Sequence, residues 1–482
     1  MQLSPSNDFV TRVASSHLGR PVSSRGRRPW HGFAIVMCCF ILQACAALPD
    51  ITDMKAGLNN SPYPTIETAK GALPKAAAGS LLSKRLAKSA DDIKALAALE
   101  EAATGVPLIA GNRLTLLFDG PRTLSAMTAA IAAAKDHVNL ETYIFDQDEQ
   151  GMRFADLLIA KQKEGVQVSI IYDSVGTIGT PKEFFERMRN AGIRLTEFNP
   201  LNPTQRTGKW RINNRDHRKI LIVDGTVAFT GGINISSSYS SSSLFRAHKP
   251  TNGNVGWRDT HIKIEGPAVA AFQWIFLNAW TSQQSEELPQ RKFFPPLSAV
   301  GDKIVRVIAS DPDGEHQIFK SYMLAIQEAK KSIHMTSAYF VPDSQLLEGL
   351  KSAARRGVDV RIVLPGVPEV GPVFYAGRTF YNELLESGVK IHELKLAVLH
   401  AKTAVIDGVW STVGSTNIDM RSFAHNHEVN LVVLGEAFGA EMESAFKEDL
   451  SDSNEMTKEK WEQRPFSDRF KEWTSRMFEY WL

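Results

Sequence analysis

The chain is poor in cysteine. Its 482 residues contain only Cys38, Cys39 and Cys45, all near the N-terminus, so a small disulfide-stabilised scaffold is excluded. An excess of one charge is also lacking, because 55 basic residues face 53 acidic ones. The first 44 residues hold five arginines and one acid, so the rest carries 50 basic and 52 acidic residues, a net charge of −2. We therefore expect no nucleic-acid partner, since a nucleic-acid backbone would need broad positive ground.

Long apolar runs are absent after residue 48. The one run, Gly32 to Leu48, follows the cationic stretch Arg25 to Arg28, which is the order of a secretory signal. It ends Leu42-Gln-Ala-Cys45, which resembles the lipobox of a bacterial lipoprotein, with Cys45 as the lipidated residue. We expect residues 1–45 to be a signal peptide, and the protein to be exported and associated with a membrane at its periplasmic face. A plain signal, or an uncleaved inner-membrane anchor over residues 30–48, are the alternatives.

Two segments flank the remaining body. Residues 46–105 alternate Pro, Gly, Ser and Asn clusters with Ala/Lys-rich pieces, which indicates a spacer and a lead-in helix near Asp91 to Ala103. Residues 456–482 place aromatic residues at helical spacing among basic ones, which predicts an amphipathic C-terminal helix. Packing of its apolar stripe on the body is the favoured interpretation, and contact with a membrane is the alternative.

The body contains an internal repeat, residues 106–290 and 301–450. Each copy has helices that lead into an apolar strand. One matching pair is Ala130 to Lys135 with Ala325 to Lys330, and two further pairs mark helices that end at a glycine, Gly165-Val166 with Gly357-Val358 and Gly192-Ile193 with Gly388-Val389. Alternating strands and helices predict the α/β class. We expect two pseudo-twofold-related repeats, each a β-sheet flanked by helices, with one shared site at the seam.

A doubled polar motif carries the chemistry. His217-x-Lys219 is followed by Asp224-Gly225, and His400-x-Lys402 by Asp407-Gly408, in the same register. The agreement extends to one asparagine seventeen residues after each histidine, Asn234 after His217 and Asn417 after His400. Two distant copies that agree at six offsets are a strong signal, whereas a single His-x-Lys would be weak.

Strand geometry suggests roles for these residues. Side chains two apart share a face, so each His and Lys project together, whereas the aspartates seven residues on, Asp224 and Asp407, are expected to be structural acids. A twofold pairing would gather two histidines, two lysines and two asparagines. Ammonium groups and amides bind phosphate oxygens, one imidazole can attack phosphorus, and the other can protonate the leaving oxygen.

These motifs resemble the phospholipase D superfamily, whose signature is a paired HxKxxxxD with a trailing GG/GS-x-N, over residues 114–450. Asn214 to Lys219, Phe229 to Asn234 and Ala338 to Asp343 look most like bacterial cardiolipin synthases. The resemblance implies a phosphohistidine mechanism without metal or other cofactor. By position, His217 would be the nucleophile and His400 the general acid and later base. Lys219, Lys402, Asn234 and Asn417 would hold the phosphate.

The same resemblance implies that an acid further along its own repeat orients each histidine. Asp259 in the first repeat and Glu428 in the second are the candidates, each opening an apolar strand. An acid bonded to one ring nitrogen fixes the tautomer and supports an imidazolium. His425 and His427 are not expected to form a metal site, because Arg421 is near in sequence and no cysteine converges.

Several functions remain open. The first is transfer of a phosphatidyl group from phosphatidylglycerol to a second phospholipid or another alcohol. The second is phospholipase D hydrolysis of membrane phospholipids to phosphatidic acid. A phosphodiesterase acting on nucleic acid is disfavoured by the charge of the body. A binding module with an inactive site is disfavoured because both repeats keep His, Lys and Asn.

Overall fold

The computed structural model describes residues 48–50, 64–86, 90–202, 213–240 and 256–477. The expected signal peptide and Cys45 lie outside these residues. Within them, no helix is both long and apolar enough to cross a membrane.

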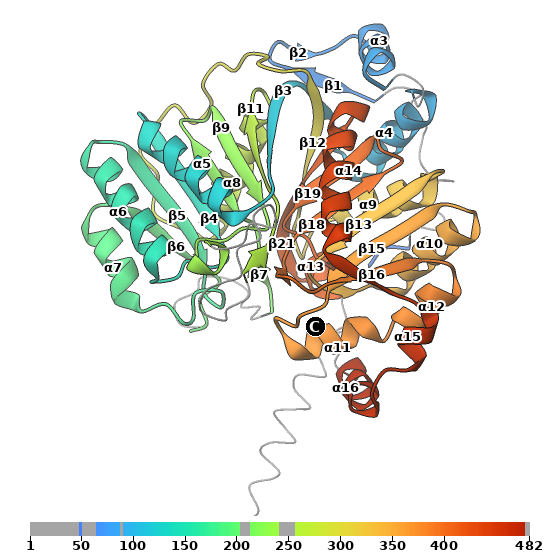
Figure 1. The fold of residues 1–482 in the computed structure, drawn as a ribbon. Coiled ribbons are helices and arrows are strands. Elements are labelled where there is room, and N and C mark those ends of the chain that lie inside the picture. The colour runs from blue at the N-terminus through green and yellow to red at the C-terminus, as the bar shows by residue number, and fades with distance from the viewer. Residues whose placement is uncertain (1–47, 51–63, 87–89, 203–212, 241–255, 478–482) are drawn as a thin grey trace, which may run out of the picture. The chain divides into compact units, whose positions relative to one another are not determined.

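The first repeat alternates strands and helices, as expected for the α/β class (Figure 1). In chain order its elements are β3 (Leu108–Leu117), α5 (Gly120–Ala133), β4 (His137–Thr142), α6 (Glu149–Lys163), β5 (Gln167–Asp173), α7 (Lys182–Asn190), β6 (Arg194–Phe198), β7 (Arg215–Asp216), β8 (Ile220–Val223), β9 (Val227–Gly231), the 3₁₀ helix η3 (Ser237–Tyr239), β10 (Trp257–Arg258), β11 (His261–Glu265) and α8 (Val269–Ser282).

The second repeat follows a similar order, with two helices instead of one between its third and fourth long strands. Its elements are β12 (Lys303–Ser310), α9 (Gln317–Glu328), β13 (Ser332–Ser337), β14 (Phe340–Val341), α10 (Ser344–Arg355), β15 (Asp359–Pro365), α11 (Gly371–Arg378), α12 (Tyr381–Glu386), β16 (Lys390–Leu394), β17 (Val398–Leu399), β18 (Lys402–Ile406), β19 (Trp410–Gly414), β20 (Ile418–Asp419), α13 (Met420–Ala424), β21 (Asn426–Leu434) and α14 (Glu436–Ser451). The duplicated α/β architecture is therefore confirmed.

Local sequence signals explain where these helices begin and end. The side chains of Asp119, Asp148 and Asp343 accept hydrogen bonds from first-turn amides and cap α5, α6 and α10. The glycines that the repeat alignment placed after helices, Gly165 and Gly357, have φ of 90° and 91°. Only glycine adopts this backbone conformation without strain, so the chain leaves each helix there and enters the next strand.

The two sheets have the same strand order. Ladder pairs give β6-β5-β4-β8-β9-β11 in the first repeat and β16-β15-β13-β18-β19-β21 in the second. In each, three parallel strands are followed by an antiparallel hairpin and a further antiparallel strand. The order of strands thus carries the pseudo-twofold relationship that the sequence repeat predicts.

Strand β3 joins the two sheets. Its second half pairs with β11 of its own repeat, and its first half pairs with β12 of the other repeat. The partner changes at Gly111, where φ is 94° and an added Cβ would lie 2.8 Å from the Cβ of Ala299. Glycine is required at this position because both the backbone conformation and the space exclude a side chain.

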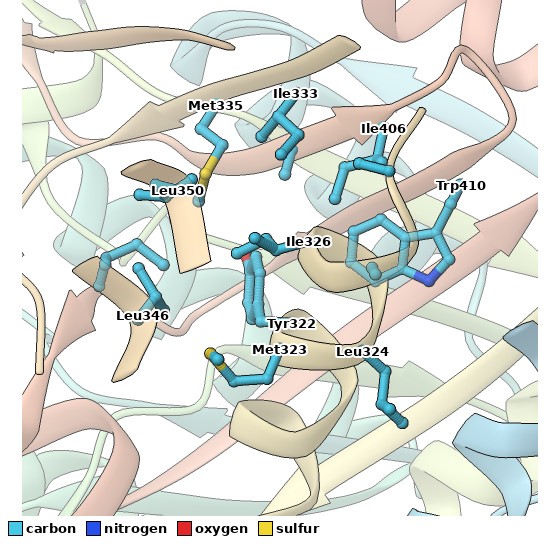
Figure 2. Close-up of a cluster of buried hydrophobic side chains, with 14 of the residues drawn as sticks. Tyr322, Met323, Leu324, Ile326, Ile333, Met335, Leu346, Leu350, Ile406 and Trp410 are labelled. Atoms are coloured by element: carbon cyan, nitrogen blue, oxygen red, sulfur yellow. The ribbon is translucent and has the colours of Figure 1, made fainter. Parts of the chain in front are cut away.

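Three large apolar cores hold the layers together. One core lies under α5, α6 and α7, and another lies under α9 and α10. Figure 2 shows the centre of the second, where Tyr322 and Ile326 of α9 meet Leu350 of α10 and Trp410 of β19. A third core lies between the repeats and joins α8 to strands of both sheets, from β11 of the first repeat to β21 of the second. The repeats therefore share one buried interface.

The segment expected to be a spacer and a lead-in helix forms a helix at the expected place, but it packs on the body rather than acting as a spacer. It forms β1 (Ile66–Thr68), β2 (Gly71–Ala72), α3 (Lys75–Leu86) and α4 (Ala90–Thr104), and β1 pairs in parallel with β3. Glu100 of α4 is fully buried and accepts hydrogen bonds from Arg306, Ser321 and Trp410 of the second repeat. Ile93, Leu96 and Leu82 join the apolar core beside α9, so their burial fixes α3 and α4 on the body.

The C-terminal segment also differs from the single helix expected. It forms β22 (Ser453–Met456), α15 (Lys458–Glu462) and α16 (Phe466–Arg476). Trp461 of α15 is buried against Tyr381, but the aromatic side chains of α16 are exposed. The favoured interpretation, packing of the whole stripe on the body, is therefore wrong for α16. Tyr480 and Trp481 lie outside the described residues.

Candidate active site

A short strand directly before each histidine pairs with a strand of the other repeat. Strand β7, directly before His217, pairs in parallel with the start of β21, and the His217 amide donates to the carbonyl of His427. In the same way β17, directly before His400, pairs in parallel with β10, and the His400 amide donates to the carbonyl of Arg258. These paired bridges bring both motifs to the seam of the repeats.

Each histidine is consequently paired with an acid of the other repeat. Nδ1 of His217 lies 3.0 Å from Oε1 of Glu428, and Nδ1 of His400 lies 2.8 Å from Oδ2 of Asp259. The expectation that each acid orients the histidine of its own repeat is therefore wrong. The physical reason is the register of the bridges, which sets the residue after His427 beside His217 and the residue after Arg258 beside His400.

These contacts define the tautomer of the rings. Nδ1 of His217 faces two acceptors, Glu428 and the carbonyl oxygen of Ser415 at 3.1 Å, so this nitrogen carries the proton. Nε2 is then the nitrogen that holds a lone pair. Both rings are mostly buried but retain some exposed area, 8% of His217 and 4% of His400.

Asp259 and Glu428 differ in side-chain length, and the residue that packs beside each carboxylate differs as well. An added Cβ at Gly232 would lie 2.2 Å from Oδ1 of Asp259, so the absence of a side chain makes room for that carboxylate. The equivalent position in the second repeat is Ser415, whose hydroxyl donates to Glu428. The GG and GS variants of the motif thus match the two acids.

The lysines lie directly beside the histidines. Nζ of Lys219 donates to the carbonyl of His217 at 2.6 Å, and Lys402 makes the same contact with His400. Both lysines are buried, and burial lowers the pKa of Lys402 and lowers that of Lys219 to about 7. An anion between these groups would favour their charged forms, because an opposite charge stabilises an ammonium.

Burial and the lysines keep the imidazoles neutral. Burial together with Lys219, Lys402 and His400 holds the pKa of His217 well below its usual value. Burial and Lys402 also lower the pKa of His400, whereas Asp259 opposes this effect. A neutral ring is the form that can donate its lone pair to an electrophile.

The pKa values of the two acids are shifted in opposite directions. Burial raises the pKa of Glu428 to about 7, despite the opposing effect of Lys219. Burial also acts to raise the pKa of Asp259, but His400, Lys402 and the Thr260 amide together bring it below its usual value. At neutral pH Asp259 is therefore ionised beside His400, where its carboxylate supports a positive charge on that ring.

The asparagines have different partners. In the first repeat, Asn234 accepts from the Ile144 amide and donates to the Tyr239 hydroxyl, which lies 3.3 Å from Nδ1 of His400. Among the described residues, Oδ1 of Asn417 is buried without a hydrogen-bond partner. The acceptor of Asn417 is therefore unsatisfied in this structure, whereas Asn234 positions Tyr239.

Asp224 and Asp407 lie in turns away from the histidines. Asp224 and Gly225 both have positive φ between β8 and β9, and Asp407 and Gly408 repeat this between β18 and β19. Such Asp-Gly pairs suit tight hairpins. The carboxylate of Asp224 accepts hydrogen bonds from the backbone amides of residues 135–137, and that of Asp407 accepts them from the amides of residues 330–332. The arrangement ties each hairpin to the neighbouring strand.

Several aromatic residues at the site were not predicted. The ring of Tyr143 packs edge-on against His217 at 5.0 Å and lies 5.2 Å from Nζ of Lys219. Trp257 lies 5.0 Å from the ring of His400. No spacing in the sequence distinguishes these residues from core aromatics, although Trp257 directly precedes the Arg258-Asp259 pair.

Among the described residues, no group of three or more His, Cys, Asp or Glu side chains is arranged to hold a metal ion. Nδ1 of His427 lies 3.9 Å from a carboxylate oxygen of Asp311.

Comparison with known proteins shows the family to which this chain belongs. The model described as "Cardiolipin synthase, PLD-like domain" matches residues 127–244 and 322–450, which contain both histidine motifs. Cardiolipin synthases of Alkalihalophilus pseudofirmus and Listeria monocytogenes are 37% and 38% identical over 77% of this chain and 72% and 76% of theirs. The solved phosphatidylserine synthase of Haemophilus influenzae shares the fold, with a TM-score of 0.61 and 13% identity over 80% of this chain and 99% of that one. The chain therefore belongs to the cardiolipin synthase family of PLD-like domain proteins.

Proposed function

We propose that the protein is a phosphatidyltransferase that makes cardiolipin from phosphatidylglycerol. The observation that carries the proposal is the pair of histidines whose Nδ1 atoms are each bound to an acid of the other repeat. This arrangement leaves two Nε2 atoms for a phosphodiester, and Lys219 and Lys402 supply its counter-charge. Sequence relatives of 37% and 38% identity are named cardiolipin synthase, which favours transfer over hydrolysis.

In the first step, Nε2 of His217 attacks the phosphorus of one phosphatidylglycerol. The bond from phosphorus to the glycerol headgroup oxygen breaks, and Nε2–H of a protonated His400 gives its proton to that oxygen. Glycerol leaves, and the phosphatidyl group remains bonded to His217. Asp259 supports this role because its carboxylate stabilises the imidazolium that His400 must form when the anionic substrate enters.

In the second step, the neutral His400 takes a proton from a glycerol hydroxyl of a second phosphatidylglycerol. The hydroxyl oxygen attacks phosphorus, and the bond to Nε2 of His217 breaks. Cardiolipin is released and both rings return to their initial forms. Lys219 and Lys402 bind the non-bridging oxygens throughout. Oδ1 of Asn417, which has no hydrogen-bond partner in the described part of the chain, accepts a hydrogen bond from a substrate hydroxyl.

Product analysis with full-length protein and phosphatidylglycerol vesicles tests the proposal. We expect cardiolipin and glycerol, and no product from the His217→Ala variant. Phosphatidic acid as the only product would support phospholipase D hydrolysis instead. Untouched lipid together with cleavage of single-stranded DNA would support a nuclease.

The location of the protein is a separate proposal. We infer from the cationic stretch and the apolar run before Cys45 that the protein is exported and carries lipid on Cys45. Metabolic labelling with a radioactive fatty acid should mark the wild-type protein and leave Cys45→Ser unlabelled. Equal labelling of both would contradict the lipobox interpretation.

A further inference from the structure

Helix α16 turns its apolar side chains away from the body. Four large side chains at helical spacing form one stripe: Phe466, Phe470, Trp473 and Met477 are exposed by 80, 56, 62 and 63%. The rings of Phe470 and Trp473 lie 6.1 Å apart. A helix on the surface of a water-soluble domain normally does the reverse, so this stripe needs a further partner.

The polar face of α16 fixes this orientation. Glu472 is buried and accepts hydrogen bonds from Arg378 of α11 at 3.2 Å and from Arg464 at 2.9 Å. Nζ of Lys471 donates to the hydroxyl of Tyr375 at 3.0 Å. Because these contacts attach α16 to α11 through charges, rotating the apolar stripe inward would leave the buried Arg378 without one of its acids.

The stripe lies one helix away from the candidate active site. Helix α11 packs against α16 at one end of the second repeat (Figure 1). Val373 and Phe374 of α11 line a narrow apolar cavity together with Tyr339 and Leu399, the residue before His400. Val370, at the start of α11, is also 40% exposed. Helix α11 therefore lies between α16 and the segment that leads into His400.

We propose that α16 binds the surface of a bilayer rich in anionic phospholipid and delivers the site to its substrate. The inference rests on the proposed function, because phosphatidylglycerol is itself an anionic lipid of such a surface. Residues 464–477 hold four basic and two acidic residues, and one of the acids is the buried Glu472. Basic residues beside an outward aromatic stripe match the headgroup region, where Trp rings and apolar side chains lie below anionic phosphates.

Tryptophan quenching by lipid tests the contact directly. Full-length protein would be reconstituted into vesicles of phosphatidylglycerol and phosphatidylcholine brominated on the acyl chains. We expect the quenched part of the fluorescence to fall in Trp473→Phe and to stay unchanged in Trp274→Phe. Trp274 of α8 is a matched control, since its exposure is 65%. The comparison holds whatever the N-terminal segment does, because that segment is the same in both variants. Equal quenching in wild type and Trp473→Phe would overturn the proposal.

A second variant links binding to turnover. Phe470→Ser/Trp473→Ser should raise the KM for phosphatidylglycerol in vesicles about tenfold and leave kcat in detergent mixed micelles unchanged. Equal loss in vesicles and micelles would contradict the proposal. So would a concentration-dependent dimer of the wild type that this variant abolishes, because the stripe would then bind a second copy. If no cardiolipin forms with wild type, the proposed function fails while the quenching experiment still decides the role of α16.

Discussion

Nδ1 of His217 lies 3.0 Å from a carboxylate oxygen of Glu428, a residue 211 positions later in the other repeat. The reciprocal contact joins His400 to Asp259 at 2.8 Å. Each histidine of the proposed reaction therefore depends on an acid that its own repeat does not supply. This exchange assigns different kinetic effects to the two acids.

The crossed pairing predicts which variant stalls after the first step. Asp259→Asn removes the acid of His400, the proposed base of the second step, and Glu428→Gln removes the acid of the nucleophile. We expect both to lower kcat about 10²- to 10⁴-fold. Labelled phosphatidylglycerol should leave more phospho-protein on Asp259→Asn than on Glu428→Gln.

Glu443→Gln is the matched control, because it removes an acid 2.9 Å from Nδ1 of His334, outside the site. Its activity should equal that of wild type. If each acid served the histidine of its own repeat, the phospho-protein would accumulate on Glu428→Gln instead.

The raised pKa of Glu428 predicts a pH-dependent stability. Burial raises its pKa to about 7 in the folded protein, from the usual value near 4.5. Between these values the unfolded chain releases the proton and the folded chain keeps it, so the free energy of unfolding falls as pH rises from about 4.5 to 7. Glu428→Gln should remove up to about 3 kcal/mol of this fall. Urea unfolding at pH 5 and pH 8 measures it, and parallel losses in both proteins would contradict the assignment.

Space at Gly232 predicts a sensitive position. An added methyl group would lie 2.2 Å from Oδ1 of Asp259, so Gly232→Ala should displace that carboxylate from His400. We expect activity to fall about 10²-fold or more. Gly179→Ala is the control, since no atom of the described segments lies within 4 Å of its added Cβ. Wild-type activity in Gly232→Ala would show that Asp259 does not need its observed position.

The buried Glu100 predicts a large effect on stability. Glu100→Ala leaves the guanidinium of Arg306 buried without its carboxylate, which typically costs about 3–5 kcal/mol. The exposed Glu186→Ala should change the free energy of unfolding by no more than about 0.5 kcal/mol. Denaturant unfolding compares the two. A small change at Glu100 would mean that α3 and α4 contribute little to the fold.

The repeats and the histidine motifs could be predicted from the sequence because each is defined by the spacing of residues within a short continuous segment. Periodic apolar strands and helix-ending glycines such as Gly165 and Gly357 appear twice in the same order. The crossed pairing of His217 with Glu428 could not be predicted in this way. It depends on bridges of two residues each, β7 with β21 and β10 with β17, which are too short to show a period.

Other differences arise from tertiary contacts that local composition does not reveal. The Ala-rich α4 has the composition of a linker helix, yet its Glu100 meets a buried arginine 206 residues later. The aromatic stripe of α16 has the spacing of a packed helix. It faces outward because Glu472 is bound by Arg378 on the opposite side.

The exchange of acids also bears on how such a chain could have arisen. A shorter ancestor with a single repeat would hold a histidine without its carboxylate and a carboxylate without its histidine. Two identical copies, associated about a twofold axis, would complete two equivalent pairs. Fusion of the copies then allows the pairs to diverge, one keeping a glycine with an aspartate and the other acquiring a serine with a glutamate.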